Sequence, residues 1–183
     1  MSLKDLTMEN HKKAERAAFV RRLMKKELTT NQYYIYLCNQ AIMYAKLEFL
    51  AEKAGVLVGI EDIERTYKMI EDIQSLRSEY PFSKFKIYDA TIAYIDYLET
   101  LKDDPHALLA HVYVRHMGDL SGGQIIKKYL PGPATHYDFD CDVDDLKERV
   151  RAKLDDSLAD EANKCFDAIQ EIFQEMELDF SAM

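Results

Sequence analysis

The fold of this chain is decided by the stretch HVYVRHMGDLSGGQIIKK at residues 111–128. Its apolar spacing predicts one long helix from Pro105 to Tyr129, yet three of the protein's six glycines stand inside it. An interior glycine costs a helix about 1 kcal/mol relative to alanine, so the three together cost about 3 kcal/mol. A fold accepts this cost where a helix bends or where its backbone must approach a neighbour closely. Because Asp119 lies among the glycines, the stretch predicts a bent helix against a flat ligand, with one acid aimed at it.

Helical spacing continues through the rest of the chain, with few alternating runs and no Asn-Gly or Asp-Gly hairpin turn. We expect helices over residues 3–26, 29–54, 59–79, 83–101, 105–129, 142–154 and 158–178. Two of the starts carry clear signals: Thr29 with Gln32 forms a capping box, and Asp104 precedes Pro105. Since no repeat or linker interrupts the 183 residues, we expect one all-α domain over residues 1–183.

Composition narrows the class of protein. No apolar run reaches the ~18 residues of a spanning helix, and the first residues, MSLKDL, lack an apolar signal segment, so we expect a soluble cytoplasmic protein with no membrane partner. Cys38, Cys141 and Cys165 form no close-spaced pair, which fits a reducing compartment. The net charge of −9 argues against nucleic-acid binding.

The charge is distributed unevenly along the chain. Residues 1–28 hold eight basic and four acidic side chains, a net charge of +4, so the remainder carries −13. A basic first helix on an acidic protein is suited to docking an acidic partner. A solvated helix face explains the same charges without any partner.

His11 is the histidine with the most suggestive surroundings. Glu15 lies one turn after it on the same face, and Lys4 lies two turns before it. A metal-bound imidazole usually donates its second N–H to a carboxylate, carbonyl or water. The three residues would suit a metal ligand, its orienting carboxylate and a base for an acidic group of the ligand. A surface histidine beside a glutamate is the simpler interpretation of the pair taken alone.

A second basic pair, Lys147 and Arg151, has the i,i+4 spacing that could clamp acidic groups, although a solvated helix face accounts for it equally well. The sequence holds no HExxH motif, no pair of Glu-x-x-His motifs and no P-loop. A glycine-rich helix, a candidate metal-binding histidine and two sets of basic residues together fit a porphyrin, which is flat, holds iron and carries two propionates.

The segments LLAHVYVR at 108–115 and MGDLSGGQ at 117–124 resemble the distal-helix signature of haem oxygenases. Leu3-Lys4 together with His11, Glu15 and Phe19 is similar in spacing to the family's proximal helix, and EAN at 161–163 with Phe166 and Phe173 resembles its last helix. The similarity covers nearly the whole chain and is weakest at residues 56–104. It implies an all-α fold in which haem is sandwiched between the proximal helix and a kinked, glycine-rich distal helix.

The resemblance assigns a role to each matching residue. It makes His11 the axial ligand of the haem iron, Glu15 the group that orients His11, and Asp119 the acid that holds water above the iron. Arg115 takes part in polar contacts behind the distal site. The glycines that bring the distal helix close and leave room for oxygen are Gly118, Gly122 and Gly123. The residues that meet the propionates are Lys4, Tyr113, Lys147 and Arg151.

The reaction implied by the resemblance opens haem at the α-meso carbon, using O2, and yields biliverdin IXα, CO and Fe2+. Reduced ferredoxin is the electron donor expected for a chain without a membrane tail, and the basic first helix is where we expect it to dock. A bilin reductase is a candidate downstream partner.

Two alternatives stay open. A haem-binding or haem-delivery protein would keep the pocket without turnover, but it would not need Asp119 beside open backbone. A di-iron oxidase would need a carboxylate–histidine ligand set, and a thiaminase-like hydrolase would need a nucleophilic cysteine such as Cys38 or Cys165. The chain departs from the family at His116 and Met117, where relatives more often have an aromatic residue and a leucine. We expect His116 to face outward.

Overall fold

The protein is described by a computed structural model over residues 2–80 and 85–183, and within these ranges it is helical and contains no strand. The prediction of an all-α fold is therefore confirmed. The α-helices are α1 Leu3–Glu15, α2 Ala18–Met24, α3 Thr30–Lys53, α4 Thr66–Glu79, α5 Asp89–Thr100, α6 Pro105–Ser121, α7 Gly123–Ile126, α8 Val143–Arg151 and α9 Ala159–Ala182. Single 3-10 turns are η1 Glu61–Ile63, η2 Lys127–Tyr129, η3 Thr135–Tyr137 and η4 Asp156–Leu158.

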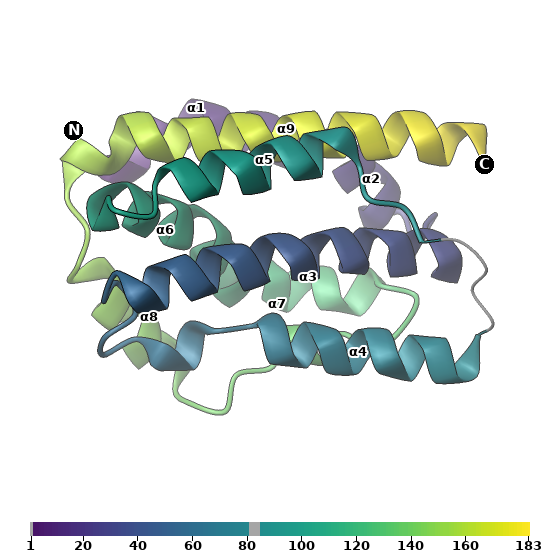
Figure 1. Ribbon diagram of the computed structural model, residues 1–183. Coiled ribbons are helices and arrows are strands. Elements are labelled where there is room, and N and C mark those ends of the chain that lie inside the picture. Colours follow the sequence, from purple (N-terminus) through teal and green to yellow (C-terminus); the bar gives the residue numbers. More distant parts are fainter. Residues whose placement is uncertain (1, 81–84) are drawn as a thin grey trace.

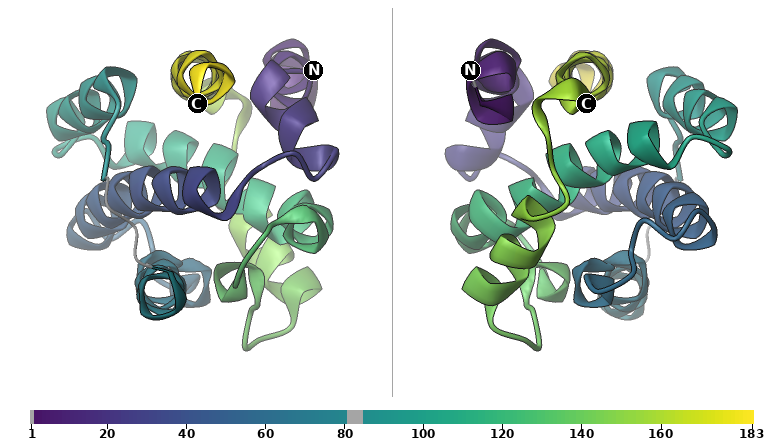
Figure 2. Two further views of the ribbon diagram at one scale, coloured as in Figure 1. Left: turned by 90° about the vertical axis from the view of Figure 1, so that its right-hand side faces the viewer. Right: turned by 90° about the vertical axis from the view of Figure 1, so that its left-hand side faces the viewer.

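The helices lie in three tiers (Figure 1). In the end views of Figure 2, α9 lies between α5 and the α1–α2 pair, with α3, α6 and α7 beneath them and α4 and α8 at the base. The two termini lie at opposite ends of the molecule. Both α1 and α6 pack against α9, so the long last helix holds the predicted proximal and distal helices in place. None of the helices in the described ranges is both long and apolar enough to cross a membrane.

Helix α3 forms the centre of the core, because every residue from 32 to 41 is buried. Its largest side chains there include Tyr33 and Leu37, which are completely enclosed. Burying a large apolar side chain contributes about 1.5–3 kcal/mol each, so this helix is held mainly by its neighbours. Tyr33 places its hydroxyl on the carbonyl oxygen of Pro133 at 2.6 Å, which satisfies its one polar group.

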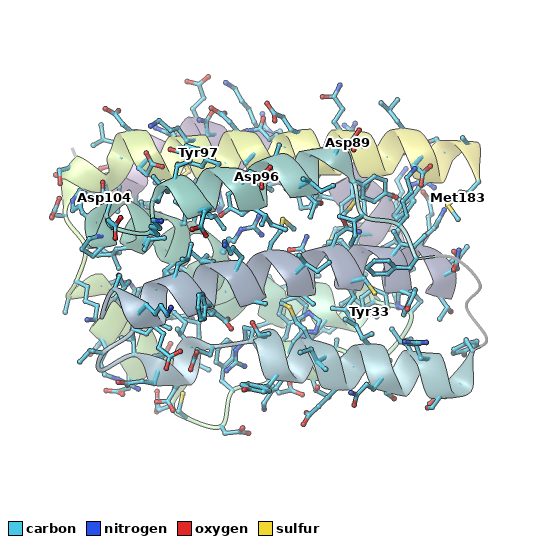
Figure 3. All side chains as sticks on the ribbon, in the orientation of Figure 1. Tyr33, Asp89, Asp96, Tyr97, Asp104 and Met183 are labelled. Carbon is cyan, nitrogen blue, oxygen red and sulfur yellow. The ribbon has the colours of Figure 1, made fainter. Side chains whose placement is uncertain are left out.

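Where the sequence carries its own capping signal, the helix begins as predicted. Thr29 and Gln32 form the expected capping box on α3. Asp104 accepts the Ala107 amide at the start of α6 and lies at the end of the molecule where that helix begins (Figure 3). The expected first helix is instead two helices, because the backbone becomes extended at Ala17. This break turns α2 so that Phe19 is buried against Phe173 of α9.

The predicted start of α4 is wrong, and side chains from other helices cap both α4 and α5. The Glu48 carboxylate of α3 accepts the amides of Arg65 and Thr66, so α4 begins at Thr66 and not at Gly59. The Glu175 carboxylate of α9 accepts the first amides of α5, which begins at Asp89. The expected start at residue 83 lies outside the described residues. At the C-terminal end, α8 stops before the predicted residue 154 and α9 continues to Ala182.

The glycine-bearing helix is bent, as its sequence predicts. Helix α6 ends at Ser121, Gly122 forms the junction, and α7 continues for only four residues before the η2 turn. Its first half is fixed to α9 by His111, which is completely buried. His111 Nε2 lies 3.0 Å from Glu161 Oε1, and Nδ1 lies 2.8 Å from the Tyr94 hydroxyl.

We predict that the His111–Glu161 pair stabilises the fold most between about pH 4.5 and 6.5. Although burial opposes a charged ring, Cys165 and Glu161 raise the pKa of His111 from 6.5 to about 9, so its contribution is full below 6.5 and lost as pH rises through about 9. The hydrogen bond from His111 lowers the pKa of Glu161 from 4.5 to about 2, so its contribution is lost as pH falls towards 2. Urea unfolding of His111→Gln should show a loss of about 3 kcal/mol within this window and a smaller loss outside it.

His106→Gln is the matched control, because this histidine lies on the same helix but is exposed. Its free energy of unfolding should follow the wild type at every pH. A stability loss in His111→Gln that is the same from pH 4 to pH 10 would show that the pair is not ionic.

Candidate functional site

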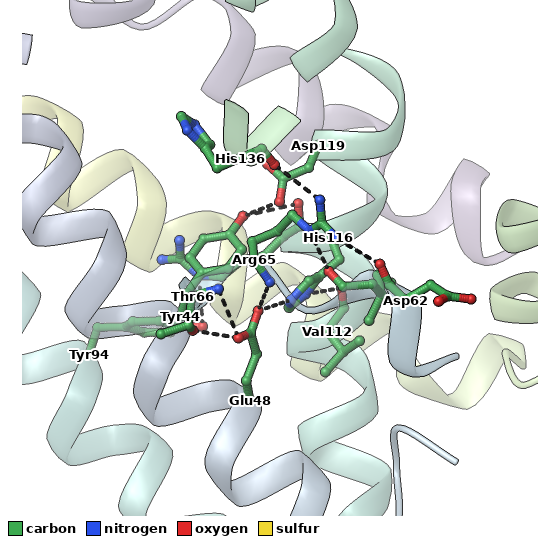
Figure 4. A network of polar contacts seen from close by, with 12 residues as sticks. Tyr44, Glu48, Asp62, Arg65, Thr66, Tyr94, Val112, His116, Asp119 and His136 are labelled. Carbon is green, nitrogen blue, oxygen red and sulfur yellow. Dashed lines mark hydrogen bonds and ion pairs between the residues drawn. The ribbon is translucent and has the colours of Figure 1, made fainter. Parts of the chain in front are cut away.

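Asp119 lies at the centre of a buried polar network (Figure 4). The Tyr44 hydroxyl of α3 donates to Asp119 Oδ2 at 2.7 Å and also reaches the Arg115 carbonyl oxygen at 3.4 Å. Burial raises the pKa of Asp119, while the positive charges of His116 and His136 and the hydrogen bond from Tyr44 oppose the rise. The Asp119 carboxyl group is therefore fixed by Tyr44, and its raised pKa favours accepting a proton.

The three glycines of the distal stretch differ in what surrounds them. A Cβ at Gly118 would meet nothing within 4 Å, and one at Gly122 would meet only the Gly118 carbonyl oxygen at 3.5 Å. A Cβ at Gly123 would lie 2.4 Å from the Tyr137 ring. Gly118 and Gly122 are exposed, whereas Gly123 is buried. Gly123 thus differs from the other two glycines, because a side chain there would enter the Tyr137 ring. That all three glycines lie close to the ligand stays a prediction.

His11 and Glu15 lie on α1, and both side chains are about half exposed or more, at 48% and 63%. The carboxylate of Glu15 faces Nδ1 of His11 at 3.7 Å, so Nε2 is the nitrogen directed away from it. The His11 ring also packs edge-on against Phe166 of α9, with 5.7 Å between ring centroids. An accessible imidazole held at its Nδ1 side and along one edge is suited to binding iron through Nε2.

The predicted propionate contacts come from three helices. Lys4 is exposed on the first turn of α1, and Tyr113 is half-buried on α6. Lys147 and Arg151 share a face of α8, where Lys147 lies 3.6 Å from the exposed Asp144 and Arg151 is exposed. Both α1 and α6 contact the η4 turn that follows α8, so the helices that carry these groups meet near this turn. None of these four side chains is fixed by a buried contact, so each is free to meet a ligand.

Arg115 is buried and makes polar contacts with two neighbouring helices. Its Nε donates to the Tyr94 hydroxyl at 3.1 Å, and Nη1 reaches Gln40 Oε1 at 3.3 Å. Its guanidinium group also lies 4.5 Å from the centre of the Tyr94 ring. These contacts join α6 to α3 and α5.

His116 does not face outward, and the expectation for it is wrong. The residue is completely buried, and its Nε2 lies 3.0 Å from Glu48 Oε1. No local pattern predicts this pairing, because Glu48 is 68 residues away and resembles an ordinary charge on the outer face of a helix. Tyr44 was not predicted either, since its partner Asp119 lies on another helix.

The alternatives based on other chemistry find little support in this geometry. Among the residues that the structure describes, no three histidine, cysteine or acidic side chains gather as a metal-ligand set. Burial raises the pKa of Cys38 to about 11, which makes its thiol a poor nucleophile. Cys165 is completely buried, so no substrate reaches it.

Fold and site together define an all-α protein with an accessible histidine on one helix and bare backbone beside a buried acid on another. The sequence model described as heme oxygenase matches residues 1–175. The chain belongs to the haem oxygenase family, whose members are enzymes that cleave haem to biliverdin.

Individual relatives agree with this assignment. The chain is 27% identical to the haem oxygenase of Pyropia yezoensis, over 95% of this chain and 84% of that protein. It is 30% identical to haem oxygenase 2 of Rattus norvegicus, over 96% of this chain and 64% of that protein. The crystal structure of haem oxygenase-1 from Synechocystis, solved in complex with haem, superposes with a TM-score of 0.85 at 28% identity, covering 97% of this chain and 91% of that one.

We predict that alanine substitutions at Gly123 and Gly118 have different effects on the free energy of unfolding. Gly123→Ala forces its new methyl group into the Tyr137 ring and should lower the free energy of unfolding by about 1–3 kcal/mol. Gly118→Ala meets no neighbour and should be neutral or stabilising, because alanine favours a helix by about 1 kcal/mol. Urea unfolding of the ligand-free variants measures both. Equal destabilisation of the two variants would contradict the assignment of Gly123 to packing.

Proposed function

We propose that this chain binds haem between α1 and α6 and opens its ring at the α-meso carbon, giving biliverdin IXα, CO and Fe2+. His11 is the axial ligand and Glu15 orients it. O2 is the co-substrate, and reduced ferredoxin supplies the electrons. The observation that carries the proposal is Asp119, a buried acid fixed by Tyr44 at 2.7 Å beside the open backbone of Gly118 and Gly122.

The residues around this position fit a flat iron-containing ligand. The ring of His11 is accessible, and a Cβ at Gly118 would enter open space. Haem, as the substrate, supplies the iron at which O2 is activated. Gly118 and Gly122 add no side chain there, so the distal backbone can lie close to the ring and restrict the room for oxygen.

Asp119 manages protons in this proposal and does not touch iron. Its raised pKa lets the carboxyl group accept a proton more readily than an exposed aspartate does. Because Tyr44 occupies Oδ2, the other carboxyl oxygen is the one available to hold water. A carrier protein would bind haem without such a group, and this is the reason for preferring an enzyme to a delivery protein.

The basic groups of α1 and α8 set the orientation of haem within its plane. Lys4, Lys147 and Arg151 carry positive charge, and Tyr113 offers a hydroxyl, so together they suit two propionates. Holding the propionates at one edge fixes which meso carbon lies under the distal backbone. We assign the α edge on the family resemblance.

Electron delivery is assigned to the basic surface of α1 and α2, which would dock an acidic ferredoxin. Arg22 of α2 is already engaged within the protein, because it forms a bidentate ion pair with Glu177 at 2.9 and 2.7 Å. Arg16, Arg21 and Lys25 are exposed and stay available. The three cysteines are unpaired, which fits the reducing cytoplasm where ferredoxin and a bilin reductase would be met.

We predict that hemin added to the protein, followed by ferredoxin, its reductase and NADPH, is converted to biliverdin, seen as loss of the haem absorption and growth of a biliverdin spectrum. Asp119→Ala should bind hemin but form biliverdin about a hundredfold more slowly, because its proton-handling group is gone. His11→Ala should change the spectrum of the bound haem. Stable haem in the wild type would indicate a carrier, and normal biliverdin yield in Asp119→Ala would refute the role of the acid.

We predict that the triple charge reversal Arg16→Glu, Arg21→Glu and Lys25→Glu raises KM for ferredoxin about tenfold by weakening electrostatic attraction. Turnover with ascorbate should stay at the wild-type rate. Lys102→Glu, a reversal at an exposed lysine outside α1 and α2, is the matched control. An unchanged KM for ferredoxin in the triple variant would place the docking surface elsewhere.

A further inference from the structure

Helices α3 and α6 are joined by two polar contacts at matching positions. Tyr44 and Glu48 lie four residues apart on α3, and His116 and Asp119 lie three apart on α6, so each pair shares one helix face. Tyr44 donates to Asp119 Oδ2 at 2.7 Å, and His116 Nε2 lies 3.0 Å from Glu48 Oε1. All four side chains are buried. The catalytic candidate Asp119 is thus one member of a four-residue set (Figure 4).

Both ring nitrogens of His116 make a hydrogen bond. Nδ1 lies 3.2 Å from the Val112 carbonyl oxygen, which can only accept, and Nε2 faces the Glu48 carboxylate. Burial alone would raise the pKa of Glu48, but bonds from His116, Thr66 and the Arg65 amide hold it below its usual value. Both ring nitrogens thus face acceptors, and Nε2 lies within ion-pair distance of the Glu48 carboxylate. His116 and Glu48 therefore form a buried pair.

The His116–Glu48 pair influences Asp119 in two ways. The His116 ring lies 5.0 Å from the Tyr44 ring, centroid to centroid, so it packs against the phenol that binds Asp119. His116 also lies one helical turn before Asp119, where its positive charge favours the ionised carboxyl group. One side chain thus influences both the position and the charge of the acid.

Charged and titratable groups from four elements face Asp119. They are Tyr36 and Tyr44 from α3, His116 from α6, Arg65 ahead of α4, and His136 and Tyr137 from η3. Two of these groups make their hydrogen bonds to other partners. The guanidinium group of Arg65 donates to three backbone carbonyl oxygens, those of Asp62, Ile63 and Asp138. His136 Nδ1 lies 2.7 Å from Asp72 Oδ2. His116 is distinguished from them by its contact with Tyr44.

We infer that His116, held by Glu48, is a positioning residue for Asp119, which it fixes through Tyr44 without touching the ligand. The inference rests on the proposed role of Asp119 in haem cleavage. Glu48 also caps α4, so the same carboxylate couples the arrangement of the distal acid to the packing of a neighbouring helix.

The first test uses the ligand-free protein. Infrared spectra recorded over a pH series locate the protonated carboxyl band of Asp119, identified by its absence in Asp119→Asn. His116→Gln should raise the midpoint of this band by about one pH unit or more, because an opposite charge and a fixed hydroxyl are both lost. Glu48→Gln, which keeps the shape of the side chain, should shift it in the same direction. An unmoved midpoint in both folded variants would overturn the inference.

His111→Gln is the matched control, since His111 is also a buried histidine of α6 paired with a glutamate, but it faces α9. It should lose stability and keep the Asp119 midpoint of the wild type. A shift in His111→Gln equal to that in His116→Gln would show a general effect of destabilisation and would also overturn the inference.

The second test uses the hemin complex. His116→Gln should bind hemin with unchanged affinity and form biliverdin about ten- to a hundredfold more slowly, because a misplaced group loses up to about this factor. The double variant His116→Gln/Asp119→Asn should be as slow as Asp119→Asn alone, whereas losses that multiply would contradict the inference. A wild type that forms no biliverdin would refute the proposed function, while the infrared midpoints would still decide the positioning of Asp119.

Discussion

The Glu48 carboxylate is the group on which the arrangement of the distal side depends. It comes from the central helix α3, accepts the first amides of α4 and pairs with His116 of α6. A carboxylate is costly to bury, and it is stable here because each of its lone pairs meets a donor. The helices α3, α4 and α6 are therefore fixed to one point, and Asp119 lies one helical turn from His116.

A second constraint comes from α9. This helix packs against α1 and α6 at once, so the accessible His11 and the bare backbone of Gly118 and Gly122 keep a fixed relation. The buried pair of His111 and Glu161 holds α6 at this crossing, and Phe166 of α9 packs against the His11 ring. The two sides of the proposed haem site are thus built on one rigid support, as a site that must hold a flat substrate requires.

How much could be predicted from the sequence depends on where the determining interaction lies. The starts of α3 and α6 were predictable, because their capping residues are local. The starts of α4 and α5 were not, because their amides are bound by carboxylates from α3 and α9. In the site, the glycines could be singled out because they are unfavourable in a helix, and Asp119 because it lies among them. The resemblance assigned His11 as the iron ligand. Tyr44, Glu48 and the inward position of His116 left no local sign, since only the packing of α3 against α6 brings them together.

The most direct test of the account is the crystal structure of the hemin complex. The account predicts haem between α1 and α6, with His11 Nε2 bound to iron, the backbone of Gly118 and Gly122 over the opposite face, and a water bound to Asp119 on that side. Iron bound by another histidine, or haem lying away from Gly118 and Gly122, would contradict it.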